Sequence, residues 1–128
     1  MTFLCLGYYD PDAFDALDEA EQQAIARECA PHDRALRESG RLRAVASLAH
    51  RAAVTLRPRP GGGSTTVDGP FTEAKEVVGS FFIVEADDLE EAARIASLHP
   101  AARWGKHLGF AVEVHPIEFH EVVAPPAP

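Results

Sequence analysis

Cysteine, basic residues and long apolar runs are all scarce in this chain of 128 residues. Two cysteines are too few for a disulfide framework, and 12 Lys and Arg against 20 Asp and Glu give a formal net charge of −8. Nucleic acid and anionic membranes would repel such a surface, so we expect neither as a partner. No apolar run approaches the ~20 residues of a membrane span. The first residues lack the basic segment of a signal peptide, which favours a cytoplasmic protein.

Apolar residues, by contrast, are plentiful. They make up 46% of the chain, which is enough for the core of one domain at this length. We expect that single domain to span residues 1–123, and the Pro- and Ala-rich residues 124–128 to form a disordered tail.

Two segments, Thr2–Tyr9 and Val77–Glu85, are apolar at odd and even positions alike. Successive residues of a strand face opposite sides, so both segments are predicted to be strands covered on both faces. Further strands are expected over residues 41–50, 51–57, 65–67 and 110–119. In the strands predicted over residues 41–50 and 51–57, the side chains expected to pack are Val45, Leu48, Val54 and Leu56.

A long helix is predicted after the first strand. Asp18 followed by Glu21 has the spacing of a capping box, and Gly40 stands where a C-cap belongs. Pro31 lies inside this segment, and we expect it to kink the helix or to break it in two near Ala30. The apolar stripe of this region consists of Phe14, Ile25, Cys29, His32 and Leu36.

A second helix is predicted to begin at Asp88, with Glu91 three residues on, and to end before His99. The resulting order, β–α–β–β–(short β)–β–α–β, is that of an α+β fold with a largely antiparallel sheet. Two helices cover only one face of such a sheet, yet two of its strands are apolar on both. We therefore expect a homodimer that packs sheet against sheet.

The segment Asp68–Glu76 (DGPFTEAKE), followed by Gly79 and an aromatic strand, resembles the DGPF motif of the YCII-related family. His99–Arg103 and Val112–Ile117 resemble the second signature of that family, with His115 in place of its usual arginine. The likeness covers residues 2 to about 119.

The resemblance implies a ferredoxin-like domain, with two main helices on one face of the sheet, that dimerises as an α+β barrel. It also implies a cleft lined by a His–Asp pair. In shorter members the histidine lies on the first helix, about three turns before a Gly-Arg-Leu turn. Counting back from Gly40 reaches Cys29, whereas His32 lies about one turn closer, and a kink at Pro31 would compensate.

Asp68 and His32 are the candidate acid–base pair. Asp68 opens a tight turn in which an aspartate caps its own backbone, so a structural role is the alternative to proton transfer. His32 falls on the apolar stripe, where a histidine is either hydrogen-bonded inside the core or serves as a general base.

Thr72, Glu73 and Lys75 are candidate substrate-binding residues. They would line a polar pocket at the dimer seam, where Lys75 suits an anionic or phenolic ligand, or they form one solvated turn of opposite charges. Trp104 either walls a ligand pocket or caps the connection between the second helix and the last strand.

No cofactor and no metal site are predicted. The segment Gly61–Ser64 lacks the Gly-Lys that follows in a phosphate-binding loop, and Cys5 and Cys29 are expected to be buried, reduced thiols. The histidines without the ligand spacing of a zinc site are His50, His99, His107, His115 and His120.

Two function classes remain open. The first is a cofactor-independent enzyme acting on a small molecule, with Asp68 and His32 as the acid–base pair and Lys75 steering an anionic substrate. The second is a non-catalytic ligand-binding or regulatory dimer. The resemblance gives this second class a context, since such proteins often occur beside, or fused to, extracytoplasmic-function sigma factors.

Overall fold

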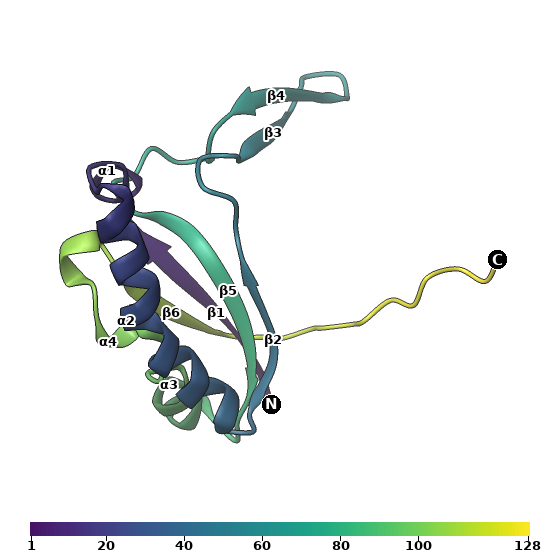
Figure 1. The fold of residues 1–128 in the computed structure, drawn as a ribbon. Helices are drawn as coiled ribbons and strands as arrows, with labels where there is room; N and C mark the ends of the chain where they lie inside the picture. The colour runs from purple at the N-terminus through teal and green to yellow at the C-terminus, as the bar shows by residue number, and fades with distance from the viewer.

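Four antiparallel strands form the central sheet in a computed structural model that describes residues 1–128 (Figure 1). Across the sheet the strands are β2 (Leu42–Ser47), β5 (Val77–Glu85), β1 (Thr2–Tyr9) and β6 (Ala111–Pro116). The two strands that are apolar at odd and even positions, β1 and β5, occupy the two central places. The prediction of both strands is confirmed.

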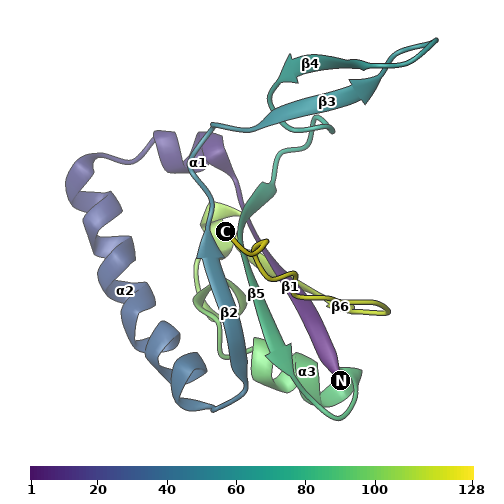
Figure 2. The same ribbon diagram turned by 90° about the vertical axis from the view of Figure 1, so that its right-hand side faces the viewer.

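The helices all lie on one face of this sheet, and the other face is left open (Figures 1 and 2). The chain thus has an α+β fold with an antiparallel four-stranded sheet and two main helices, as expected. None of its helices combines the length and the apolar character that crossing a membrane requires. The helical elements are α1 (Pro11–Asp15), α2 (Glu19–Glu38), α3 (Leu89–Ala96), α4 (Pro100–Arg103) and a 3-10 turn, η1 (Lys106–Leu108).

Helix α2 begins at the predicted capping box. The Asp18 carboxylate accepts from the Glu21 N–H at 2.7 Å, and the Glu21 carboxylate accepts from the Asp18 N–H at 3.1 Å. The predicted break near Ala30 is wrong, because α2 continues through Pro31 to Glu38. Pro31 is exposed, so the one backbone bond that it removes faces a solvated side of the helix.

The core lies mainly between the sheet and helix α3. Helix α2 contributes only Leu36 to it, and the other members of the predicted stripe on α2 are half-buried. Space therefore remains between the middle of α2 and the sheet. The buried core consists of Phe3, Cys5, Leu36, Phe82, Val84, Ala86, Ala92 and Ala96.

Strands β3 (Val54–Pro58) and β4 (Ser64–Asp68) form a separate hairpin that projects from the body (Figures 1 and 2). Val54 and Leu56 were expected to pack in the core, and this expectation is wrong, since they are 59% and 66% exposed. Alternation identified a strand but not its partner, and the hairpin pairs only with itself. Val45, in the edge strand β2, and Leu48, directly after that strand, are likewise exposed.

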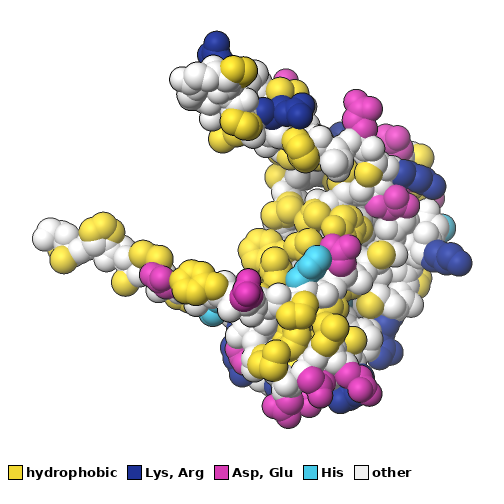
Figure 3. All heavy atoms as spheres, turned by 180° about the vertical axis from the view of Figure 1, so that it is seen from behind, with side chains coloured by type: hydrophobic (Ala, Val, Ile, Leu, Met, Phe, Trp, Pro, Cys, Tyr) yellow, Lys and Arg dark blue, Asp and Glu magenta, His cyan; other side chains and the backbone are white.

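The open face of the sheet carries apolar residues from both central strands. In the register of β1 and β5, Leu4 lies opposite Ile83 and Leu6 opposite Phe81, and all four side chains are half-buried. Figure 3 shows hydrophobic side chains gathered on this side of the molecule, between the hairpin and the C-terminal residues. This is the second apolar face that the sequence predicted.

Candidate functional site

A cavity of about 430 Å³ lies between helix α2 and the sheet. Its floor comes from β1 and β5, which contribute Gly7, Gly79 and Ser80, and α2 contributes Cys29 and Asp33. The lining is completed by His99, Pro100 and Ala101 at the start of helix α4, and by Tyr9, Phe14 and His50.

Two glycines keep the floor of this cavity open. A Cβ at Gly7 would lie 2.3 Å from the Ser80 Oγ and 3.7 Å from the His99 Cε1. A Cβ at Gly79 would lie 2.6 Å from the Tyr9 Cδ1, inside the aromatic ring's contact distance. Glycine in the middle of a central strand commonly marks such a close approach. Each glycine therefore makes room for a polar side chain that lines the cavity.

His99 is a buried polar side chain that lines the cavity. Its side chain caps α4, with Nδ1 accepting from the Ala101 N–H at 3.0 Å. A neutral imidazole with Nδ1 as acceptor carries its proton on Nε2. No side-chain nitrogen or oxygen is both enclosed and without a partner, so Nε2 keeps an opening to solvent. His99, which lines the cavity, therefore keeps an N–H donor that no protein group occupies.

The surroundings keep this imidazole neutral. Burial lowers the pKa of His99 below its ordinary value, although the nearby charge of Asp33 acts in the opposite direction. Burial also raises the pKa of Cys29, and the charges of Asp33 and Glu28 add to this effect. Cys29 is accordingly a thiol at neutral pH and a poor nucleophile.

A second group of polar side chains lining the cavity is formed by Tyr9 and His50. The Tyr9 hydroxyl is 2.7 Å from the His50 Nδ1, and the His50 Nε2 is 2.7 Å from the Asp15 Oδ1. Arg51 donates to the Asp15 Oδ2 at 2.7 Å and to Asp12. Phe14 contacts both rings, with its centroid 5.1 Å from that of His50. The cluster connects the cavity to the surface of α1.

The predicted acid–base pair lies elsewhere. Asp68 ends strand β4 in the projecting hairpin, and His32 lies half-buried on α2 (Figure 1). Neither lines the cavity, although Asp33, the neighbour of His32, does. The predicted binding residues Thr72, Glu73 and Lys75 are exposed in the loop between β4 and β5.

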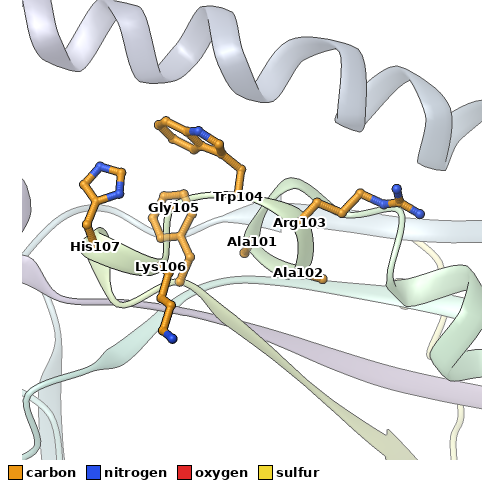
Figure 4. A pocket seen from close by; sticks show the side chains of 8 residues that line it. Ala101, Ala102, Arg103, Trp104, Gly105, Lys106 and His107 are labelled. Atoms are coloured by element: carbon orange, nitrogen blue, oxygen red, sulfur yellow. The ribbon is translucent and has the colours of Figure 1, made fainter.

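Trp104 lines a second depression of about 400 Å³ beside the cavity (Figure 4). Its ring points toward α2 and meets those of His107 and Phe110 edge-on, with centroids 5.5 and 6.1 Å away. Ala101 and Phe110 line both the cavity and this depression, so the two are adjacent. The structure holds no group of three or more His, Cys, Asp or Glu side chains arranged to bind a metal ion.

Comparison with known proteins gives the family. The sequence pattern of the YCII-related domain matches residues 1–118. The chain belongs to the YCII-related domain family. This confirms the expectation drawn from the segment Asp68–Glu76.

Two individual proteins are similar to this chain. "Uncharacterized protein R00369" of Rhizobium meliloti (strain 1021) is 29% identical over 96 residues, which are 75% of this chain and 77% of that protein. Among solved structures, 5-chloro-2-hydroxyhydroquinone dehydrochlorinase (TftG) from Burkholderia phenoliruptrix AC1100, in complex with 2,5-dihydroxybenzoquinone, has a TM-score of 0.48 and 20% identity. That comparison covers 94% of this chain and 96% of the other.

The residues that line the cavity were largely missed by sequence reasoning. The sequence links His99 to the family signature and to a metal site that its spacing does not support, but not to a cavity, although a histidine directly before a proline has the pattern of an N-cap followed by the first helical residue. Gly79-Ser80 inside an otherwise apolar strand was a second signal of close approach. No signal in the sequence linked Tyr9 to His50, because 41 residues separate them.

Proposed function

We propose that this protein is a small-molecule enzyme that transfers a proton within the cavity between α2 and the sheet. The observation that carries the proposal is the state of His99, a buried neutral imidazole that lines the cavity, whose Nδ1 is fixed by the Ala101 N–H and whose Nε2–H is not enclosed. A group fixed in this way is ready to act on a ligand without rearranging first.

A neutral imidazole donor suits a carbonyl oxygen or the oxyanion that forms from it. The Nε2–H can hydrogen-bond that oxygen and stabilise negative charge as it develops. The Ser80 hydroxyl lies beside the imidazole, since both approach the same point above Gly7. Asp33, on α2, also lines the cavity, and its charge acts on the imidazole.

The proposal is tested with a metabolite library in a thermal-shift screen. A compound that binds the cavity raises the melting temperature of the wild type, by an amount corresponding to about 2.7 kcal/mol at 100 times Kd. His99→Asn keeps an acceptor for the Ala101 N–H but loses the imidazole, so the shift should disappear. His120→Asn, in the exposed C-terminal segment, is the matched control and should keep the full shift.

Binding alone does not establish catalysis, so each hit is then incubated with protein and followed by NMR. Conversion by the wild type and the control variant, with loss in His99→Asn, is the expected result. A library that shifts wild type and His99→Asn equally would contradict the proposed site.

A second candidate is a ligand-binding or regulatory homodimer without catalysis. The open apolar face of the sheet, with Leu4, Leu6, Phe81 and Ile83, favours a partner that covers it, and a second copy would form a dimeric α+β barrel. The non-catalytic function is favoured if compounds bind in the cavity but none of them is converted.

A further inference from the structure

We propose that the Tyr9 hydroxyl is the proton-accepting group of the cavity, and that His50 and Asp15 are the positioning residues that relay its proton. The inference rests on the proposed function, because it assigns the partner of the His99 donor. The substrate class that it implies is a compound with an acidic O–H, or a C–H next to a carbonyl: an enol, a hydroxyketone or a phenol.

The chain of hydrogen bonds has a defined direction. The hydrogen bond from His50, followed by that from Arg51, lowers the pKa of Asp15, which is therefore a carboxylate and can only accept. The His50 Nε2 must then donate to Asp15, and in the neutral imidazole this leaves the His50 Nδ1 as an acceptor. Burial raises the pKa of Tyr9, so its hydroxyl keeps its proton and donates it to Nδ1.

The geometry around Arg51 holds this relay in place. Arg51 has φ of 54°, and it is the one residue other than glycine with a positive φ. Such a backbone costs free energy and persists where surrounding contacts enforce it. Here Arg51 occupies the second oxygen of Asp15 and also reaches Asp12, so the carboxylate presents its first oxygen to His50. If this cluster served only to anchor the loop at Arg51, the ion pairs of Arg51 with Asp12 and Asp15 would be enough, and the bonds of His50 to Asp15 and Tyr9 would not be required.

Tyr9 and His99 both lie against the strands that form the floor of the cavity. The Tyr9 ring lies against Gly79, and His99 lies against Gly7, whose strand partner is Ser80. A planar ligand on this floor can therefore meet the Tyr9 oxygen with one edge and the His99 Nε2–H with another. Aromatic side chains of Tyr9, Phe14 and Phe110 line the same space and suit a flat ring.

The proton transfer balances without any further reagent. The Tyr9 oxygen takes a proton from the substrate while its own proton moves to the His50 Nδ1. Tyr9 ends as it began, His50 becomes a cation paired with Asp15, and the substrate becomes an enolate or phenolate. The negative oxygen accepts from the His99 Nε2–H. Reversal of the relay returns the proton to another atom of the substrate.

The relay is tested on the full chain with benzenesulfonyl fluoride. The phenol oxygen bonds to sulfur, fluoride leaves, and the phenolic proton passes to His50. Tyr8 is a matched reference, because its hydroxyl donates to the Glu113 carboxylate at 3.0 Å instead of to an imidazole. We expect Tyr9 to be sulfonylated more than about tenfold faster than Tyr8, as resolved by tandem mass spectrometry, since general bases commonly contribute more than this.

Variants separate a relay from a structural anchor. His50→Gln should bring the Tyr9 rate down to that of Tyr8, and Asp15→Asn should lower it in part, while the Tyr8 rate, which reports on folding, stays constant. Histidine ¹⁵N NMR should find the His50 proton on Nε2. Equal rates at the two tyrosines, a Tyr9 rate unchanged in His50→Gln, or a proton on Nδ1 would each overturn the proposal.

The labelling experiment does not involve His99, so its outcome is independent of the metabolite screen. If labelling fails while His99→Asn abolishes ligand binding, the relay falls and the proposed function stands. If labelling succeeds and no compound is bound or converted, the proposed function falls and the reactive tyrosine remains.

Discussion

The imidazole of His99 lies parallel to the ring of Phe82, with the centroids 4.7 Å apart and 2° between the planes. Phe82 is fully buried in the central strand β5, so the imidazole rests on the core of the domain. Protonation would place a cation on this apolar support. The stack therefore connects the state of the cavity's donor to the stability of the fold.

The first prediction concerns acid. The pKa of His99 in the folded chain lies below the ordinary value of 6.5, so the unfolded chain takes up a proton first as pH falls. Stability is then full above pH 6.5 and declines below it, by at most about 1.4 kcal/mol per pH unit. Urea unfolding between pH 7.5 and 5 measures the slope. His99→Asn should flatten it, and an unchanged slope would contradict the assignment.

Titration of carboxylates does not contribute to the stability change measured between pH 7.5 and 5. Asp15, Glu85 and Glu113 also have lowered pKa values, but their ordinary values are 3.8 to 4.5. Their contribution to stability is therefore lost below pH 4.5, outside the window used for His99.

The second prediction concerns the floor of the cavity. Alanine at Gly79 would place a Cβ within 2.8 Å of two atoms of the Tyr9 ring, which cannot move without disturbing its bond to His50. We expect Gly79→Ala to destabilise the fold by about 1–3 kcal/mol and to remove the fast labelling of Tyr9. Chemical denaturation and mass spectrometry provide the two readouts.

Gly7 allows a matched test of the same idea. The clash of an alanine there is with the Ser80 Oγ at 2.3 Å, whereas the Ser80 Cβ lies at an ordinary 3.6 Å. Ser80→Ala should therefore rescue Gly7→Ala, and the double-mutant cycle should give a favourable coupling. Additive effects would show that Ser80 is not the group that requires glycine.

The third prediction concerns Pro31. This residue removes one hydrogen bond inside an otherwise continuous helix and is exposed, so nothing in the core depends on its ring. Pro31→Ala should raise the free energy of unfolding by about 1–3 kcal/mol, which thermal and urea unfolding can measure. A loss of stability would mean that the proline's restriction of the unfolded chain outweighs the missing bond.

The fourth prediction concerns the homodimer. Leu6 lies on the open face of the sheet, opposite Phe81. Sedimentation should give a mass near twice 13.8 kDa for the wild type, and Leu6→Lys should shift it toward the monomer. Arg59→Lys, a conservative change in the exposed hairpin segment, serves as the control. A wild-type monomer at micromolar concentration would contradict the dimer.

Sequence patterns identified most elements because their signals are local. The double-faced strands, the box of Asp18 and Glu21, and the cap at Asp88 all depend on residues within a few positions of one another. The site did not follow from these signals. The charge of Asp33 acts on His99, and Tyr9 bonds to His50, only because the folded chain brings them together, and tertiary proximity has no short-range pattern. The prediction that Val54 and Leu56 pack in the core is wrong for a similar reason. The alternation in Val54–Pro58 indicates a strand but does not show which strand it pairs with.

The bare floor of the cavity has a consequence for how the family diversifies. Gly7 and Gly79 belong to the two most enclosed strands, so a larger side chain there disturbs the fold before it can reshape the site. The α2 side tolerates exchange, because Cys29 and Asp33 lie at partly or fully exposed positions of a helix that adds one residue to the core. Differences in ligand preference among relatives should therefore accumulate on the helix, over a floor that stays the same.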